Sequence, residues 1–356
     1  MPRRALVLGA TGQIGRATVQ RLAADGWRVD AVSRGSRPRV RWPAEWEVRT
    51  HHLDRADDAA LRRLVGTGCD LLVDCLAYTS RDAVQLVSLG DGVGAAVVIS
   101  TCMVYRGPEG GDFGGDVGAY PALPVPVRED QPCLSPDDHT YAGGKAAVEQ
   151  VLLERAPFPV TVLRPGMVHG PHSATPREWY FVKRALDRRP VRLLAYGGAA
   201  GCHPSATLNL AELVRAAAAR PHGPRVFNAG DPGPPTVREM AAAVDAALGR
   251  TSEAYLLDGG GAPGLGRTPW SLNHPLVMDM ARAERELGYR PVCDYAASLP
   301  ETVLWLRDPV RAADWSVAFP ALARRWGRTA FAYAAEDRAV KAGQVRGVPL
   351  IAAGQT

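Results

Sequence analysis

Long hydrophobic runs are missing from this sequence. No segment reaches the roughly 18 uninterrupted apolar residues that a helix needs to cross a bilayer. The chain begins Met1-Pro2-Arg3-Arg4, and the apolar run that follows meets Gly9 too soon to form the core of a signal peptide. We therefore expect a soluble protein with no membrane partner.

Metal-binding cysteine patterns and runs of positive charge are missing as well. The six cysteines include no C-x-x-C pair and no Cys/His spacing of a zinc site, which favours a reduced, cytoplasmic setting and no metal. Lysines and arginines are scattered, so no nucleic-acid partner is expected. The formal charge of +5 and the pI near 9.0 instead suit an anionic cofactor or substrate.

What the sequence does contain is an alternation of short apolar runs and helical patterns. Apolar residues make up 46% of the chain and charged residues 22%, which allows a sizeable core. The alternation is typical of βαβ units and predicts an α/β fold with a Rossmann-type, doubly wound parallel sheet. Strands are expected at 5–8, 27–33, 48–53, 71–77, 95–100, 160–163 and 226–228, and helices at 14–24, 59–65, 82–89, from near 141, and at 280–287.

The length of 356 residues exceeds the size at which one core usually stops growing, so a smaller second part is expected. We assign residues 1–170 to a dinucleotide-binding Rossmann domain, with its sheet completed by segments near 205–230. Residues 171–310 are assigned mainly to a C-terminal α/β substrate-binding domain, and 311–356 to a C-terminal extension. A Gly-, Pro- and Asp-rich stretch at 106–138 is long enough for a functional loop.

A glycine-rich turn joins the first expected strand to the first expected helix. Its spacing is G-x-x-G-x-x-G rather than the G-x-G-x-x-G of the dinucleotide fingerprint, and glycines permit a tight turn against a pyrophosphate. The alternative is an ordinary Gly-rich turn. The residues expected to contact the cofactor here are Gly9, Thr11, Gly12, Gln13, Ile14 and Gly15.

The second expected strand ends in Ser33-Arg34, where an NAD-selective protein would carry an acid for the adenosine ribose. A guanidinium can pair with a 2′-phosphate, and Arg37 and Arg39 follow closely. NADP(H) is therefore favoured over NAD(H), which stays as an alternative. The other interpretation of Arg34 is a solvated loop residue.

Tyr141 and Lys145 are four residues apart, so a helix would place them on one face. An ammonium near the phenol favours phenolate, which would let Tyr141 exchange a proton near neutral pH. A surface pair without function has the same spacing. A second signal, S-T-C-M-V-Y at 100–105, follows a strand and could bring a hydroxyl to the same place.

Together these segments resemble the extended short-chain dehydrogenases/reductases, the group of nucleotide-sugar epimerases and dehydratases. The resemblance covers most of the chain. Besides the glycine turn, the 100–105 block and the Tyr/Lys pair, it includes L-R-P-G-M-V-H-G-P at 163–171, V-F-N-A-G at 226–230, R-E-L-G-Y-R-P at 285–291 and E-T-V-L-W-L at 301–306.

The resemblance implies a Thr-Tyr-Lys site. Thr101 would hold the substrate oxygen, Tyr141 would exchange its proton, and Lys145 would bind the nicotinamide ribose and tune the tyrosine. Thr101 could instead cap backbone groups at the strand end. Pro165 and Gly166 would lie near the nicotinamide. Because ligands bind at the carboxyl ends of parallel strands, the cofactor is also expected to contact Leu53, Ala77 and Ser100.

The chain departs from the family at several substrate positions. Cys102 and Met103 replace the Asp-Glu pair of the dehydratases, so dehydration is not expected. Met167 stands where an Asn often binds a nucleotide diphosphate, and Cys202-His203 stand at an Arg-Asp pair. Trp179, in a segment that also holds Arg177, could stack on a substrate ring or pack as part of a helix. Candidate substrate contacts are therefore Cys102, Met103, Met167, Trp179 and His203.

The sequence thus predicts an NAD(P)-dependent oxidoreductase that transfers hydride at a secondary alcohol or ketone of a sugar-like or other polar small molecule. It would act as an epimerase or a ketoreductase, and the family allows a homodimer. The alternative is a non-catalytic dinucleotide sensor or an RNA-associated relative that keeps the fold.

Overall fold

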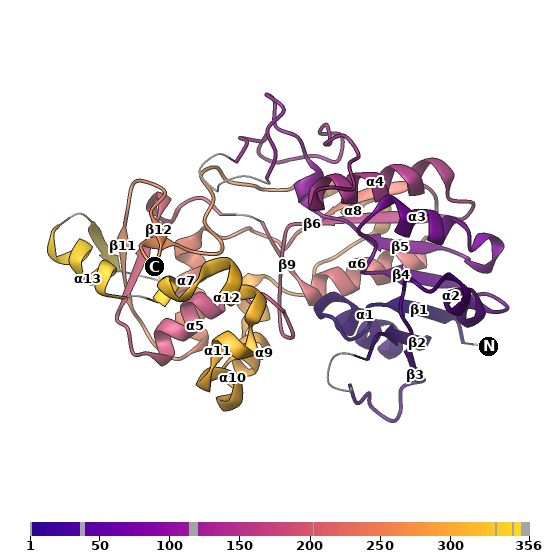
Figure 1. The fold of residues 1–356 in the computed structure, drawn as a ribbon, viewed down its shortest axis with the longest axis horizontal. Coiled ribbons are helices and arrows are strands. Elements are labelled where there is room, and N and C mark those ends of the chain that lie inside the picture. Colours follow the sequence, from indigo (N-terminus) through magenta and orange to yellow (C-terminus); the bar gives the residue numbers. More distant parts are fainter. Residues whose placement is uncertain are drawn as a thin grey trace.

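The computed structural model describes residues 2–35, 40–113, 120–201, 203–331, 333–343 and 345–349. Figure 1 shows two parts that lie beside each other, one built on a large sheet and one richer in helices and late chain segments. The chain passes between these parts more than once, so neither is a continuous stretch of sequence.

A seven-stranded parallel sheet forms the larger part, as the sequence predicts. The strand order is β10-β6-β5-β4-β1-β2-β3, so the chain starts near the middle, builds toward one edge, and then crosses back to build the other. The strands are β1 (Arg4–Leu8), β2 (Arg28–Ser33), β3 (Val48–His52), β4 (Leu71–Asp74), β5 (Ala96–Ile99), β6 (Val160–Pro165) and β10 (Arg225–Ala229).

Helices cover both faces of this sheet, which makes it doubly wound. The two covering layers pack in separate hydrophobic clusters. One layer holds α1 (Gln13–Ala24), α6 (Thr207–Ala219) and α8 (Ala281–Leu287), and the other holds α2 (Asp58–Val65), α3 (Ser80–Val87) and α4 (Tyr141–Arg155). Because both faces are covered, the central strands are largely apolar, and positions 5–8 of β1 are fully buried.

The observed elements differ from the expected ones mainly at their ends. The expected strand at 71–77 stops at Asp74, whose carboxylate accepts a hydrogen bond from the Leu76 N–H and pairs with Arg55. The expected helix at 82–89 begins earlier, at Ser80, because Thr79 and Asp82 form a reciprocal cap at its start.

The second part has its own small sheet and core. Its three strands are β8 (Val191–Leu194), β11 (Glu253–Leu256) and β14 (Arg346–Pro349). The helices packed with it include α5 (Trp179–Leu186), α7 (Val237–Ala247), α9 (Tyr295–Leu306), α12 (Pro320–Trp326) and α13 (Tyr333–Lys341). A short parallel pair, β7 (Met167–His169) and β9 (Pro204–Ala206), lies between the parts.

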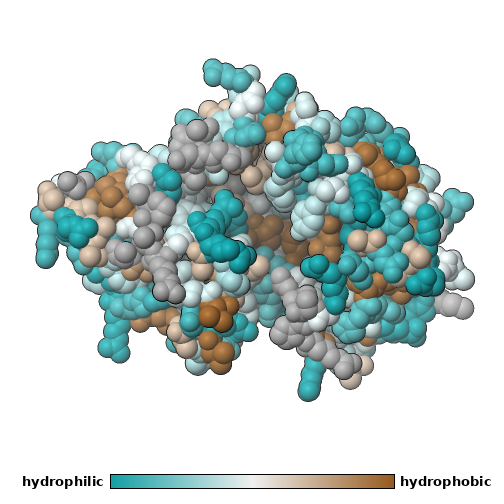
Figure 2. All heavy atoms as spheres, viewed as in Figure 1, coloured by the Kyte–Doolittle hydropathy of each residue, from teal (hydrophilic) through white to brown (hydrophobic). Residues whose placement is uncertain are grey.

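Hydrophilic side chains cover much of the face shown in Figure 2, and hydrophobic ones are visible in the recess between the two parts. No helix in the described part of the chain is both long and apolar enough to cross a membrane.

Candidate active site

The glycine turn lies at the carboxyl end of β1 and leads directly into α1. Gly9 has a φ of +86°, a conformation that favours glycine. A Cβ on Gly15 would lie 2.2 Å from the carbonyl oxygen of Gly9, and one on Gly12 would lie 3.2 Å from the same atom. The turn is therefore folded tightly enough that side chains would fill it, which fits close backbone approach to a pyrophosphate.

One cavity opens at this turn, and six of the thirteen expected cofactor contacts line it: Gly9, Thr11, Gly12, Ser33, Arg34 and Leu53. It is lined by Leu8, Gly9, Thr11, Gly12, Val32, Ser33, Arg34, Leu53, Arg55 and Leu76. Within the described residues, the buried Ser33 hydroxyl has no hydrogen-bond partner. A cavity with an unpartnered hydroxyl and a guanidinium at the end of β2 fits an adenosine ribose or its 2′-phosphate. Arg37 and Arg39 lie outside the described residues.

Arg55 also lines this cavity, although it was not among the residues selected from the sequence. Its guanidinium forms ion pairs of 2.7 Å with Asp74 and with Asp82. It also donates a hydrogen bond to the Gln85 side chain. Through these partners, Arg55 connects β4 with α3. Arg34, in contrast, is exposed at the edge of the cavity.

Other expected cofactor residues have structural partners of their own. The Gln13 amide donates to the Gly170 carbonyl, and Ile14, in the first turn of α1, packs against the core. The Ser100 hydroxyl donates to the buried Glu149, so this side chain is used inside the protein. A Cβ on Gly166, which follows Pro165 at the end of β6, would lie 2.1 Å from the His203 carbonyl.

The Tyr141-to-Lys145 segment forms the first turn of α4. The Thr140 side chain caps the helix by accepting a hydrogen bond from the Gly143 N–H. A Cβ on Gly144 would lie 2.4 Å from the Tyr78 carbonyl oxygen. Gly144 therefore lets the start of α4 pack directly on the chain that follows β4.

Tyr141 lies at the surface of the site with 51% of its area exposed. Partial burial raises the pKa of its phenol to about 12, and the neighbouring Tyr78 adds to this rise. A hydrogen bond from Thr101 and the positive charge of Arg177 act in the opposite direction on that pKa. The phenol is therefore protonated at neutral pH in the absence of a bound cofactor.

Lys145 is fully enclosed directly beneath this surface. Its Nζ donates hydrogen bonds of 2.7 Å to the carbonyls of Ala77 and Ile99, and it lies 4.4 Å from the ring centre of Tyr78. Burial lowers the pKa of this ammonium to about 8, against the opposing charge of Asp74. The positive charge of Arg177 favours the phenolate of Tyr141. The expected effect of Lys145 on the same phenol stays a prediction.

Thr101 caps the backbone after the strand and also contacts Tyr141. Its hydroxyl accepts a hydrogen bond of 3.2 Å from the Met103 N–H, and its side chain also interacts with the Tyr141 phenol. Cys102 is buried, and Met103 packs at the edge of an apolar cluster. Because neither side chain is a carboxylic acid, the two residues after Thr101 supply no acid/base pair of the dehydratase type.

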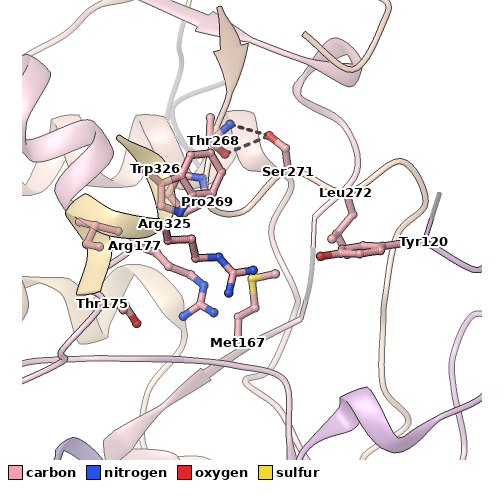
Figure 3. A pocket seen from close by; sticks show the side chains of 11 residues that line it. Tyr120, Met167, Thr175, Arg177, Thr268, Pro269, Ser271, Leu272, Arg325 and Trp326 are labelled. Atoms are coloured by element: carbon pink, nitrogen blue, oxygen red, sulfur yellow. Dashed lines mark hydrogen bonds between the residues drawn. The ribbon is translucent and has the colours of Figure 1, made fainter. Parts of the chain in front are cut away.

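A second cavity lies between the two parts, and Figure 3 shows its lining side chains. Met167, an expected substrate contact, forms one wall. The lining residues are Tyr120, Met167, Thr175, Arg177, Thr268, Pro269, Ser271, Leu272, Leu322, Arg325 and Trp326. Tyr120 comes from the long loop predicted to be functional, and Arg177 connects this cavity electrostatically with Tyr141.

Of the five expected substrate residues, Met167 lines this cavity, whereas Cys102, Met103, Trp179 and His203 do not. Trp179 is fully buried at the start of α5 and packs edge-on against Phe319, so the packed-helix alternative describes its position. His203 is also buried: its Nε2 donates to the Asp231 carbonyl, and its Nδ1 accepts from the Met278 N–H. With both ring nitrogens engaged, and its pKa lowered by burial, His203 has no nitrogen directed toward a substrate. Cys202 lies outside the described residues.

The sequence interpretation missed Tyr78 and Arg325. Tyr78 follows an expected strand end, but a tyrosine there has no spacing signal, and only the packing shows it beside both Tyr141 and Lys145. Arg325 lies in the segment expected from sequence only to be a C-terminal extension. The apolar residues around it predict a helix but not the cavity that the helix borders.

The architecture agrees with solved structures. WbmH from Bordetella bronchiseptica, in complex with NAD+, is 18% identical, with a TM-score of 0.65. UDP-glucose 4-epimerase from Thermotoga maritima, with UDP-glucose, is 18% identical (TM-score 0.64), and UDP-glucuronic acid 4-epimerase from Bacillus cereus, with UDP-glucuronic acid and NAD, is 16% identical (TM-score 0.62). Each comparison covers 86% of this chain and 99% of the other.

No curated protein sequence matches the chain. The profile of the NAD dependent epimerase/dehydratase family, in contrast, matches residues 5–200, which is more than half of the sequence. This match agrees with the parallel sheet, the glycine turn and the Tyr/Lys helix described above. The chain therefore belongs to the NAD dependent epimerase/dehydratase family, and it is an enzyme of the short-chain dehydrogenase/reductase type.

Proposed function

We propose that the protein oxidises or reduces a secondary alcohol or ketone on a sugar-like substrate, with Tyr141 as the acid/base. The observation that carries this proposal is that the Tyr141 phenol interacts with Thr101, which follows β5, and with Arg177, which lines the second cavity. Because β1 and β5 are parallel strands of one sheet, the glycine-turn cavity and Thr101 lie at the same, carboxyl end of that sheet.

The chain's own residues would divide the work as follows. Thr101 would orient the substrate oxygen through its hydroxyl, and the Tyr141 hydroxyl would give or take the proton on that oxygen. Lys145 would bind the nicotinamide ribose after exchanging at least one carbonyl contact for a ribose hydroxyl. When bound, the nicotinamide supplies the hydride acceptor or donor. Arg177 would favour the phenolate through its positive charge.

The preferred cofactor in this proposal is NADP(H). Arg34 is exposed at the edge of the cavity and, among the described residues, makes no hydrogen bond or ion pair. Ser33, beside it, has a buried hydroxyl without a described partner. Both groups suit a 2′-phosphate, whereas an NAD-selective site would place an acid there. The similar structures above that contain a cofactor contain NAD, so NAD(H) is the alternative.

Epimerisation and simple reduction share this site, whereas dehydration would need a further acid/base pair. Two of the similar structures are named as 4-epimerases of UDP-linked sugars, and this supports the epimerase alternative. An epimerase must keep its cofactor through the reaction, so cofactor that is retained through purification would distinguish it from a reductase that exchanges NADPH freely.

The deciding experiment replaces Tyr141 with phenylalanine. Loss of the acid/base hydroxyl should reduce turnover by roughly two to four orders of magnitude while cofactor binding, measured by fluorescence titration, is preserved. Tyr255→Phe is the matched control, because that hydroxyl lies in the small sheet and bonds only to Glu253 among the described residues. The assay is a panel of ketones and sugar derivatives with NADPH.

Unchanged turnover in Tyr141→Phe would remove this residue from the reaction. Cofactor binding in the unmodified protein without turnover of any panel member would favour the non-catalytic sensor instead.

A further inference from the structure

Two arginines from distant parts of the chain line the second cavity. Arg177 lies just before α5, and Arg325 lies in α12 of the C-terminal segment. In Figure 3 both guanidinium groups extend toward the side chain of Met167. No acidic residue is among the described residues that line the cavity, so its wall is positively charged.

The helix α12 is fixed in this position by its apolar side. Leu322 is 4% exposed and packs in the core of the second part together with Phe319. Leu322 and Trp326 also line the cavity, so α12 forms part of its wall. Arg325 is anchored by the helix backbone, and within the described chain its guanidinium makes no hydrogen bond or ion pair. The group is therefore available to a ligand without breaking an existing interaction.

Arg177 lines the cavity and also acts on the reacting group. Its positive charge lowers the pKa of the Tyr141 phenol. Its guanidinium donates a hydrogen bond of 3.5 Å to the Val168 carbonyl and lies 5.8 Å from the ring centre of Trp270. These contacts hold Arg177 at the cavity wall.

We propose that Arg177 and Arg325 together bind a phosphate or carboxylate group of the substrate, which makes α12 an element of substrate specificity. Guanidinium groups bind both anions through paired, charge-assisted hydrogen bonds, and two of them on one wall fit one compact anion. This rests on the proposed function, because it places that anion on the molecule that reacts at Tyr141. It also places recognition of the anion on two arginines, whereas the sequence pointed to Met167 and His203 as substrate contacts.

The test measures binding without turnover. Calorimetry on the full-length protein would compare three probes that share a sugar frame: glucose 1-phosphate, glucuronate and uncharged glucose. We expect both anions to bind more tightly than glucose, and Arg325→Gln to weaken anion binding by about tenfold or more, the usual effect of losing a hydrogen bond to a charged group. Arg177→Gln should do the same, and added salt should weaken anion binding in the unmodified protein.

Arg324→Gln is the matched control. Arg324 is on the same helix, is exposed, and does not line the cavity, so its loss removes the same charge without removing the contact. Tighter binding of glucose 1-phosphate than glucuronate would identify a phosphate, and the reverse order a carboxylate.

Three results would overturn the proposal: anions that bind no better than glucose, an Arg325→Gln variant with unchanged affinity, or an equal loss in Arg324→Gln. These results are separate from the Tyr141→Phe assay. Binding could depend on Arg325 even if Tyr141 played no part in turnover, and Tyr141 could be essential even if Arg325 bound nothing.

Discussion

Lys145 should make the fold less stable at neutral pH, and its replacement by methionine should reveal this cost. Burial lowers the pKa of the folded ammonium to about 8, from 10.5 in the unfolded chain. Between these values the unfolded state binds more protons, so the stability contributed by this group is lowest below pH 8 and rises as the pH increases toward 10.5. A shift of this size corresponds to about 3 kcal/mol at neutral pH.

Between pH 7.5 and 9.5, this titration should raise the free energy of unfolding of the unmodified protein by about 2 kcal/mol relative to Lys145→Met. The variant also leaves the carbonyls of Ala77 and Ile99 without their 2.7 Å partner, which costs about 1–3 kcal/mol. The titration term balances or exceeds this cost at pH 7.5, so the variant should be at least as stable as the parent there. Relative to the parent, the variant should lose about 2 kcal/mol of stability between pH 7.5 and 9.5.

Urea unfolding at several pH values measures both proteins. Comparing them removes the contribution of the buried cysteines and tyrosines, whose raised pKa values change the slope in both alike. Parallel curves across this range would refute the reasoning, because they would show that Lys145 does not titrate differently in the folded and unfolded chains. Cofactor affinity, measured on the same samples, should fall in Lys145→Met at every pH.

Two further predictions concern the cofactor cavity and the start of α4. Arg34→Ala should reduce the affinity for NADP(H) by about tenfold or more, because it removes the guanidinium that binds the 2′-phosphate. NAD(H) has no 2′-phosphate, so its binding should be nearly unchanged. Equal losses of affinity for both cofactors, measured by calorimetry, would contradict this prediction. Gly144→Ala should destabilise the fold by about 1–3 kcal/mol and lower turnover, because its Cβ would lie 2.4 Å from the Tyr78 carbonyl. Denaturant unfolding checks this, and an unchanged midpoint would show that the helix start can shift freely.

The parts of the fold that could be predicted are those with a local cause. The apolar run at residues 5–8 predicts a buried strand, and Gly9 directly after it predicts a turn. Both predictions depend on neighbouring residues alone, and the seven-stranded parallel sheet and the glycine-turn cavity agree with them. The spacing of Tyr141 and Lys145 likewise predicts one helical turn, and α4 begins at Tyr141. The direction of each side chain was harder to predict. Lys145 turns inward to two carbonyls because α4 packs on the chain after β4.

The substrate side depends on contacts between distant segments, which periodicity does not encode. Trp179 and Arg177 are two residues apart, yet one is in the core and the other lines the cavity. From sequence, an aromatic residue at the start of an amphipathic helix could pack in the core or stack on a substrate. Trp179 packs in the core, where it contacts Phe319, a residue 140 positions later in the chain. His203 could be placed near the site from sequence, but its two hydrogen bonds to the main chain arise only when β9 meets the segments after β10 and before α8.

The C-terminal segment shows why Arg325 can serve a site far from it in sequence. A flexible tail would have to be ordered whenever substrate bound, and this entropy cost would offset much of the gain from one guanidinium. Here the segment is already held: β14 pairs with β11, and Glu336 of α13 accepts a hydrogen bond from the fully buried Arg184 of α5. Leu322 of α12 packs in the core of the second part, and the chain after α12 is held by these two attachments. The backbone that carries Arg325 is therefore in position before the substrate binds. Only the side chain then remains to be ordered, so the charge of Arg325 can contribute to substrate affinity.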